Sequence, residues 1–459
     1  ARSHPDRTAL IFRDRPVSFG ELERRAGGLA RALRARGVSP GDAVAWLLPN
    51  GPDFVACYFA TLALGAIGVP LDVRMSTEDA RAILEHAGAR LAVVTSEWAS
   101  RLPGCLAVED LREGAPLEVR ERSEDEEALY MYTSGSTGAP KGVVLTFRNF
   151  NGFLRFMEHF GFADPEGALL LWMPMSHISG PIFCNELVRR GCRLAVLDHI
   201  SPRAILGAVE RHRVVGFHGV PTVVQALLRH PRRDRYDLRS LRWIALMGMA
   251  VNPHLVEELA RALPHVAVVQ GYGLTETASL VTVVPLQEAE RKRASIGRPI
   301  PGAELRVVDA EGQPLGPGQV GEILVRGDMV MKGYLRDPEA TARRMRGGWL
   351  HTGDLGWYDE DGYYYFAGRA DEMIVTGGMN VYPAEVEGVI ARHPRVQEVA
   401  VVGVPHPERG QVIKAVVVGQ VSAEEVLSFC RRHLAPYKVP RVVEVRPELP
   451  RTRTGKVAK

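Results

Sequence analysis

The first 370 residues alternate short apolar runs with amphipathic helical segments, and this alternation limits the possible folds. Residues 91–95 are apolar and β-branched, whereas residues 81–87 before them have the spacing of a helix. Residues 241–247 form another apolar run of strand length. Such alternation is typical of an α/β fold with mostly parallel sheets. Because 459 residues exceed what one hydrophobic core holds, we expect two or three domains.

The pattern changes twice farther along the chain. Between about 296 and 365, short strands and Gly/Pro turns predict a small β-rich subdomain. We expect an N-terminal domain over 1–369 that includes it, and a C-terminal domain over 370–459. The C-terminal unit has two helical and two strand patterns, at residues 383–393, 423–433, 396–404 and 414–418. A small α+β unit joined by one polar segment predicts a mobile lid with its hinge at Asp371.

Charge, cysteine content and hydropathy exclude several classes of protein. The chain has 57 basic and 54 acidic residues, a net charge of +3, which predicts no nucleic-acid partner. Its five cysteines form no CxxC pair, as is typical of a reduced, cytoplasmic compartment. Glycines and Pro70 interrupt the longest uncharged run, residues 54–71, so we interpret it as a buried helix and a strand, not a transmembrane segment. These features are compatible with a homodimer as well as with a monomer.

A loop rich in glycine and hydroxyl side chains follows a predicted strand at residues 128–133. Residues 133–142 are Thr-Ser-Gly-Ser-Thr-Gly-Ala-Pro-Lys-Gly. Glycines let backbone N–H groups approach an anion, and hydroxyls with an ammonium supply further donors, so the loop predicts phosphate binding. A P-loop phosphotransferase is the obvious alternative. The spacing counts against it, because Lys141 lies between proline and glycine and an apolar, strand-like run follows where a P-loop needs a helix.

Four more glycine-containing motifs follow this loop. They are residues 270–277, 349–354, 368–387 and 450–457. An apolar run leads into the first, where we expect a loop, and the second places Asp354 after a glycine turn. In this order the five segments resemble the adenylate-forming superfamily of acyl-CoA synthetases, luciferases and nonribosomal adenylation domains. The resemblance covers essentially the whole chain.

The resemblance implies a role for each motif residue. The phosphates of ATP would be held by the first loop, through Thr133, Ser134, Gly135, Ser136, Thr137, Gly138 and Lys141. Adenine would bind on the aromatic face in the second segment, formed by Gly271, Tyr272, Gly273 and Thr275. Glu276 and Thr137 would bind Mg²⁺, a hard cation that prefers oxygen ligands. Asp354 would accept the ribose hydroxyls, with Arg369 beside it.

The implied reaction has two steps. An ionised carboxylate attacks the α-phosphorus of ATP and expels pyrophosphate, so catalysis rests on positioning and charge stabilisation. Lys456 would draw the carboxylate and the α-phosphate together. The lid would then rotate and bring Gly377 and Gly378 to line a tunnel for the thiol arm of coenzyme A. His177 would gate this site or assist the thiol step.

We expect an AMP-forming acyl-CoA synthetase for an apolar monocarboxylic acid, fatty or aromatic. Residues 173–180 carry no acid that could pair with the ammonium of an amino acid. One alternative is an acyl-AMP ligase that loads a carrier protein. Another is a CoA ligase for a dicarboxylate such as an aryl-succinate, for which Arg189, Arg190 or His218 would supply the cation. A non-catalytic nucleotide-binding protein is the alternative outside enzymes.

Overall fold

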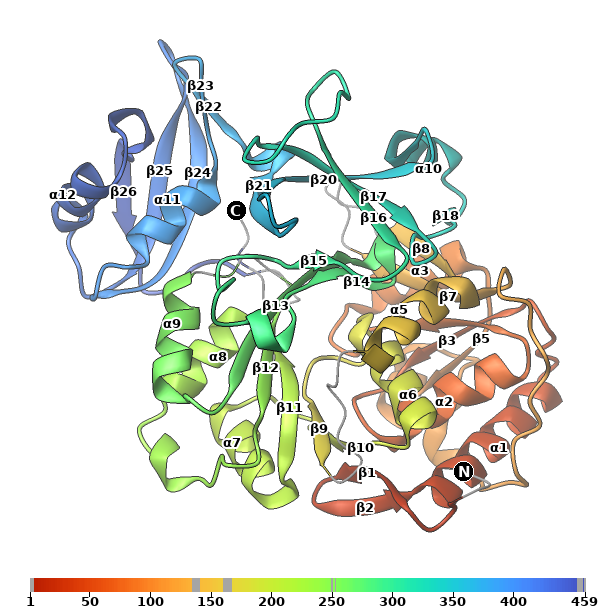
Figure 1. Cartoon of the computed structure of the whole chain (residues 1–459). Coiled ribbons are helices and arrows are strands. Elements are labelled where there is room, and N and C mark those ends of the chain that lie inside the picture. Colours follow the sequence, from red (N-terminus) through yellow and green to blue (C-terminus); the bar gives the residue numbers. More distant parts are fainter. Residues whose placement is uncertain are drawn as a thin grey trace.

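The computed structural model describes residues 4–133, 141–159, 167–248, 251, 253–451 and 457, with the side chains of 153, 155–159 and 253 left aside. Two large sheets form the N-terminal part, a third sheet follows them, and a fourth forms the C-terminal domain (Figure 1). This is the α/β fold with a large N-terminal and a small C-terminal domain that the sequence predicts. None of the described helices has the length and hydropathy that a bilayer crossing requires.

The first sheet has nine strands, and its middle is parallel. In spatial order they are β15 (Arg298–Pro299), β14 (Ser279–Val283), β13 (Ala267–Leu274), β12 (Trp243–Leu246), β11 (Val214–Gly219), β9 (Ala168–Leu171), β10 (Arg193–Val196), β1 (Thr8–Phe12) and β2 (Arg15–Ser18). Strands β13 to β1 pair in parallel, and β2, β14 and β15 pair antiparallel at the two edges.

The second sheet has seven strands and also ends in an antiparallel edge. They are β18 (Gly333–Tyr334), β8 (Lys141–Thr146), β7 (Glu127–Thr133), β4 (Ile67–Pro70), β3 (Ala43–Leu47), β5 (Ala89–Val94) and β6 (Leu106–Ala107). The hairpin β7–β8 is antiparallel, and β18 adds to its outer side.

Helices fill three layers around these two sheets. The main core lies between the sheets and includes α1 (Phe19–Ala35), α2 (Pro52–Ala63), α5 (Phe147–His159) and α6 (Ser179–Arg190). A second core packs the far face of the nine-stranded sheet against α7 (Pro202–His212), α8 (Pro221–Leu228) and α9 (Pro253–Ala262). A third packs the other sheet against α3 (Thr77–Ala87) and α4 (Ser96–Arg101). Both sheets are therefore covered on both faces, as parallel strands require.

The two smaller sheets follow in sequence. The third contains β16 (Ala303–Val308), β17 (Gly321–Gly327), β20 (Trp349–Tyr358), β19 (Met345–Arg346) and β21 (Tyr364–Arg369), with α10 (Pro338–Arg344) beside it. The fourth contains β23 (Met379–Val381), β22 (Ile374–Thr376), β25 (Gly410–Gly419), β24 (Val396–His406) and β26 (Val442–Val445). Its own apolar core includes residues of α11 (Pro383–Ile390) and α12 (Ala423–His433). Short 3₁₀ turns are η1 (Val108–Asp110), η2 (Arg233–Arg235), η3 (Thr275–Thr277), η4 (Leu286–Glu288), η5 (Ala370–Glu372) and η6 (Pro436–Lys438).

Local signals explain where many helices begin and end. Ser18 and Ser76 accept the N–H of the third residue of α1 and α3, and Gly88 ends α3 in the left-handed conformation. The capping box of Ser422 and Glu425 starts α12 at the predicted residue. The predicted helix over 383–393 ends earlier, at Ile390.

Two motifs are strands where the sequence predicts a loop or a turn. Residues 270–274 continue β13 beyond its parallel partner β12 and pair antiparallel with β14 instead. Gly353 lies inside the continuous strand β20, where residues 352–354 bulge opposite Ile323. Its φ of +70° allows the bulge. Both expectations failed because glycine signals a local backbone irregularity but does not distinguish a bulge from a turn.

Candidate active site

The candidate site lies beyond the carboxyl ends of strands in both large sheets. Thr133 ends β7 and pairs with Lys141 at the start of β8, so the predicted phosphate loop connects the two strands of a hairpin. In the other sheet, Gln270 is the last residue of β13 that pairs with β12, through Leu246, and β13 continues beyond it to Tyr272. Ligands of open α/β sheets bind beyond these ends of the strands.

A buried carboxylate, Asp354, is the centre of a first cluster. Asp354 is 2% exposed and lies on β20. The Tyr272 hydroxyl donates to Oδ2 at 2.6 Å, and Nη1 of Arg369 donates to Oδ1 at 2.9 Å. Burial raises the pKa of the Asp354 carboxyl, and the contacts with Arg369 and Tyr272 oppose that rise. A carboxylate has roughly four acceptor positions, and the described residues occupy two of those of Asp354, so two stay available for hydroxyls of a ligand.

Arg369 also joins this cluster to the start of the C-terminal domain. It is the register partner of Asp354 across β20 and β21, and its Nε lies 3.3 Å from Oδ1 of Asp371. Asp371 is 58% exposed, whereas Asp354 is buried, so the guanidinium spans from the interior to the surface. The predicted hinge residue is therefore in direct contact with the first cluster.

The glycines of β13 are required by the close approach of β14. A Cβ at Gly273 would lie 1.8 Å from the carbonyl oxygen of Ser279, and one at Gly271 would lie 3.0 Å from the Leu280 side chain. The Thr277 hydroxyl caps the turn that follows by accepting the N–H of Leu274. Thr275 lies in the same turn. This framework fixes the direction in which Tyr272 and Glu276 leave the sheet.

A second cluster joins Glu276, Tyr334 and Lys141. The Tyr334 hydroxyl donates to Oε1 of Glu276 at 2.8 Å, and the Lys141 ammonium lies 5.5 Å from the centre of the Tyr334 ring. β18 pairs Tyr334 with Val143 of β8, which places the ring beside the phosphate hairpin. Burial, and then the charge of Glu276, raise the pKa of Tyr334, so its hydroxyl stays a donor.

Two other predicted site elements are at the surface. His177 is exposed in the turn before α6, where its N–H donates to the Pro174 carbonyl at 3.0 Å. Gly377 and Gly378 form the exposed turn between β22 and β23, with φ of +59° and +81°. In Figure 1 this turn is at the far end of the C-terminal domain from β13. The structure brings neither element to the two clusters.

The remaining predicted residues lie outside the described part of the chain. They are Ser134, Gly135, Ser136, Thr137, Gly138 and Lys456. The residues that flank them are described. Arg451 and Val457 form an antiparallel bridge, so the ends of the segment that contains Lys456 lie together. Val457 packs against a small apolar cluster on the C-terminal sheet.

The three cationic candidates for a second carboxylate are not arranged for that role. Arg190 pairs with the buried Glu186 at 3.2 Å, and Arg189 is exposed near the end of α6. Burial lowers the pKa of His218 to about 4, so its ring is uncharged at neutral pH.

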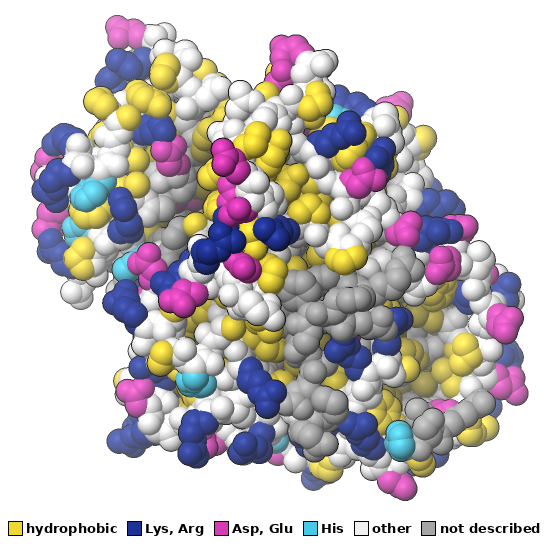
Figure 2. Space-filling model, in the orientation of Figure 1, with side chains coloured by type: hydrophobic (Ala, Val, Ile, Leu, Met, Phe, Trp, Pro, Cys, Tyr) yellow, Lys and Arg dark blue, Asp and Glu magenta, His cyan; other side chains and the backbone are white. Residues whose placement is uncertain are grey.

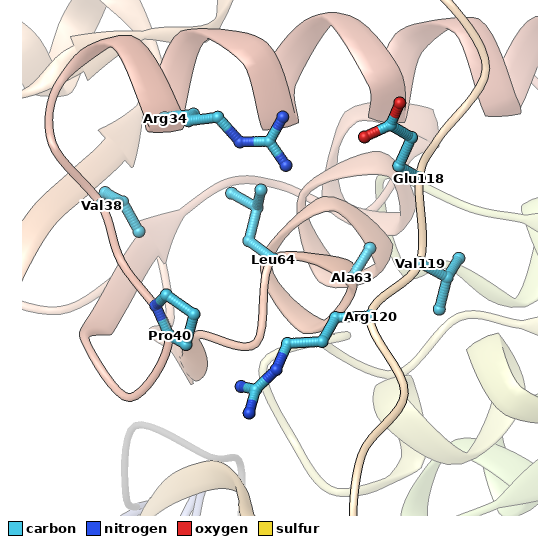
Figure 3. A pocket seen from close by; sticks show the side chains of 8 residues that line it. All are labelled: Arg34, Val38, Pro40, Ala63, Leu64, Glu118, Val119 and Arg120. Atoms are coloured by element: carbon cyan, nitrogen blue, oxygen red, sulfur yellow. The ribbon is translucent and has the colours of Figure 1, made fainter.

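A surface pocket of about 280 Å³ lies away from both clusters (Figure 3). It is lined by Arg34, Val38, Pro40, Ala63, Leu64, Glu118, Val119 and Arg120. Pro40, Leu64 and Arg120 precede β3, β4 and β7, so this pocket is at the amino ends of the strands. The pocket is therefore at the opposite end of these strands from Thr133, where the phosphate loop begins.

Comparisons with known proteins identify the family of the chain. Residues 1–335 match the family model described as AMP-binding enzyme, and residues 385–456 match the model described as AMP-binding enzyme C-terminal domain. The chain belongs to the AMP-binding enzymes. This AMP-binding enzyme is 39% identical to a feruloyl-CoA synthase of an Amycolatopsis species, over 100% of the chain and 96% of the relative. It is 32% identical to a long-chain fatty acid–CoA ligase of Bacillus subtilis strain 168, over 100% and 91%.

A solved relative has the same architecture. The O-succinylbenzoate coenzyme A synthetase of Bacillus subtilis, in complex with ATP and magnesium ion, has a TM-score of 0.89 and 33% identity, covering 99% of this chain and 96% of that chain. The expected superfamily is thus confirmed, and the AMP-binding enzyme is of the AMP-forming acid–CoA ligase type. Its relatives differ in the acid that they activate.

Sequence reasoning missed Tyr334 of this AMP-binding enzyme. It contacts Glu276, 58 residues away in the chain, through a strand of only two residues. A short Gly-Tyr pair in a β-rich region resembles many structural tyrosines, so only the pairing of β18 with β8 reveals its position. Among the described residues, no group of three or more His, Cys, Asp and Glu side chains could hold a metal alone.

Proposed function

We propose that the protein activates an apolar monocarboxylic acid with an aromatic ring and transfers it to coenzyme A. The carboxylate of the acid would attack the α-phosphorus of ATP, forming the acyl-adenylate as the bond to the leaving pyrophosphate breaks. The thiolate of coenzyme A would then attack the acyl carbon, and AMP would leave. The acid is ionised at neutral pH, so no general base is required in the first step.

The carboxylate of Asp354, held between Tyr272 and Arg369, is the observation that carries this proposal. We assign the two available acceptor positions of Asp354 to the ribose hydroxyls and the Tyr272 ring to adenine. The fixed orientation of this carboxylate supports the assignment, because hydroxyl pairs are bound best by pre-positioned acceptors.

The second cluster would face the triphosphate. Lys141, with Ser134, Ser136 and Thr137, would bind the β- and γ-phosphates, and Thr133, Gly135 and Gly138 would shape the loop. Tyr334 occupies only Oε1 of Glu276 among the described residues, so Oε2 is available for Mg²⁺, which needs few protein carboxylates when phosphates also ligate it. Bound there with Thr137, Mg²⁺ would neutralise phosphate charge.

We further propose that the C-terminal domain moves between the two steps. Lys456 would serve the first step, and a rotation at Asp371 would withdraw it and bring Gly377 and Gly378 toward the thiol. In the present arrangement their turn is distant from β13, as this order of steps requires. His177 is exposed in the turn before α6, and we assign it to the thiol step.

An aromatic monocarboxylate is favoured by the aromatic side chains on the face of the nine-stranded sheet that α6 covers. The rings of Phe183 on α6 and His218 on β11 have centroids 5.0 Å apart, and Trp243 of β12 lies beyond them. His218 is uncharged and Arg190 is paired, so a second carboxylate would find no counter-charge at these positions. The likeness to a feruloyl-CoA synthase also supports an aromatic acid.

A screen of carboxylic acids for AMP release tests the function. With ATP, Mg²⁺ and coenzyme A, aromatic monocarboxylates such as cinnamates are expected to release AMP and pyrophosphate, not ADP. Fatty acids, aryl-succinates and a carrier protein in place of coenzyme A are the comparison arms. ADP as the product, or AMP release without any acid, would contradict the proposal.

Tyr334→Phe is expected to lower the rate of ATP/pyrophosphate exchange about tenfold and to raise the Mg²⁺ concentration needed for half-maximal rate. The change removes one hydrogen bond to a charged carboxylate, about 1.5 kcal/mol, and leaves the ring over Lys141 in place. Titrating Mg²⁺ in the exchange assay measures both effects. Tyr364→Phe is the matched control, because its hydroxyl donates to the Leu305 carbonyl at 3.0 Å. An unchanged Mg²⁺ dependence in Tyr334→Phe would show that the Tyr334 hydroxyl does not support Mg²⁺ binding.

A further inference from the structure

His218 is a buried histidine whose ring has no hydrogen-bond partner among the described residues. It is 7% exposed on β11. Its backbone carbonyl accepts Nε1 of Trp172 at 2.8 Å, but no described group pairs with either ring nitrogen. A neutral imidazole has one donor and one acceptor nitrogen. The ring nitrogens are not among the fully buried side-chain atoms without a partner, so they are open to solvent and a bound ligand can replace water as their hydrogen-bond partner.

The surroundings of His218 are aromatic. The Phe183 ring lies 5.0 Å away and is tilted by 55°, and the Trp243 ring lies 5.8 Å away and is tilted by 54°. Burial lowers the pKa of His218 to about 4, so the ring offers hydrogen bonds but no charge. Such a site favours a neutral polar group carried on an aromatic ring over a second carboxylate.

His218 lies on the same side of the sheet as the first cluster. It pairs with Ala245 of β12, which pairs with Val269 of β13, so two strand spacings, about 10 Å, separate His218 from the strand of Tyr272. Figure 1 shows β11, β12 and β13 side by side. Phe183, Trp243, Val269 and Tyr272 share one core, so His218 is on the face that α6 covers.

We propose that His218 is the polar end of the acid pocket and that it hydrogen-bonds a hydroxyl group on the aromatic ring of the substrate. The inference rests on the proposed function and narrows it to phenolic acids. His218 is then a specificity-determining residue, because it favours a ring hydroxyl over a group of similar volume that cannot form the bond.

The wild-type protein allows a first test with two acids of nearly equal volume. We expect kcat/KM for 4-hydroxycinnamate, measured as AMP release with coenzyme A, to exceed that for 4-methylcinnamate about tenfold or more. Equal kcat/KM values for the two acids would overturn the proposed role of His218 but not the proposed function. Failure of every aromatic acid, with a fatty acid active, would overturn the proposed function as well. The two failures are thus distinguishable.

Variants provide the second test. His218→Phe is expected to reduce the preference for the hydroxyl acid to near one, and His218→Gln, which keeps a donor and an acceptor, to retain part of it. The ratio of the two kcat/KM values is measured within each variant, so a loss of folded protein cancels. Should His218→Phe be insoluble, the ratio in His218→Gln serves as the test. His265→Phe is the control, because Nε2 of His265 bonds the Leu238 carbonyl at 3.1 Å. An unchanged ratio in both His218 variants overturns the inference.

Discussion

Lys456→Ala is expected to slow ATP/pyrophosphate exchange by about 10²–10³-fold, which is typical of losing one donor that stabilises charge in a transition state. In the first step two anions, the carboxylate and the α-phosphate, must approach each other, and a single ammonium offsets their repulsion. The second step begins from a neutral acyl carbon, so transfer of a preformed acyl-adenylate to coenzyme A should keep the wild-type rate. Measuring both half-reactions on the same preparation separates the two effects.

Lys414→Ala is the matched control for this change. Lys414 is a lysine of the same C-terminal domain, but its ammonium pairs with Glu444 at 2.6 Å on the neighbouring strand. Both half-reactions should be close to the wild-type rate in this variant. An equal loss of both half-reactions in Lys456→Ala would contradict a role of Lys456 in the first step alone, because it would indicate a structural effect of the substitution.

Asp354→Ala is expected to lower kcat/KM for ATP by about 10²-fold or more, and to destabilise the fold as well. The ribose would lose both acceptors, each a bond to a charged group of about 1.5–3 kcal/mol. The buried hydroxyl of Tyr272 would also lose its acceptor, and the guanidinium of Arg369 would keep only Asp371. Arg369 is 32% exposed and can be solvated, so we expect about 1–3 kcal/mol of lost unfolding free energy, not the full cost of a buried charge.

Two further variants calibrate the Asp354 result. Tyr272→Phe removes only the hydroxyl and should cost about tenfold in kcat/KM for ATP. Asp361→Ala removes a carboxylate that is 49% exposed and pairs with Arg291 and Lys292 at the surface, so neither kinetics nor stability should change measurably. Urea unfolding and steady-state kinetics at varied ATP report the two quantities. An unaltered KM and kcat for ATP in Asp354→Ala would remove Asp354 from the nucleotide site.

The sequence predicts the architecture because parallel sheets depend on local patterns. Covered strands are short apolar runs, helices have amphipathic spacing, and caps such as Ser422 with Glu425 mark helix starts. It also predicts the hairpin at Thr133 and Lys141, because the apolar strands on both sides are contiguous with the glycine loop. The motif order then identifies the superfamily.

Contacts between segments that are far apart in the chain could not be predicted from the sequence. Tyr334 reaches Glu276 through the two-residue strand β18, which no periodicity marks. Residues 270–274 were expected to be a loop, but β14 supplies a new antiparallel partner after β12 ends, and partners cannot be inferred from one strand alone. The charge state of His218 depends on the rings packed around it, which come from α6 and β12.

Arg369 has a consequence for how binding energy is shared within this protein. One guanidinium serves Asp354, in the first cluster, and Asp371, at the start of the C-terminal domain. A movement that carries Asp371 away changes the environment of the cation on which Asp354 depends. Coupling free energies are reciprocal, so the factor by which a bound nucleotide shifts that movement equals the factor by which the movement shifts nucleotide affinity. A change in nucleotide affinity when the two domains are held in one orientation therefore gives the coupling free energy between nucleotide binding and domain movement.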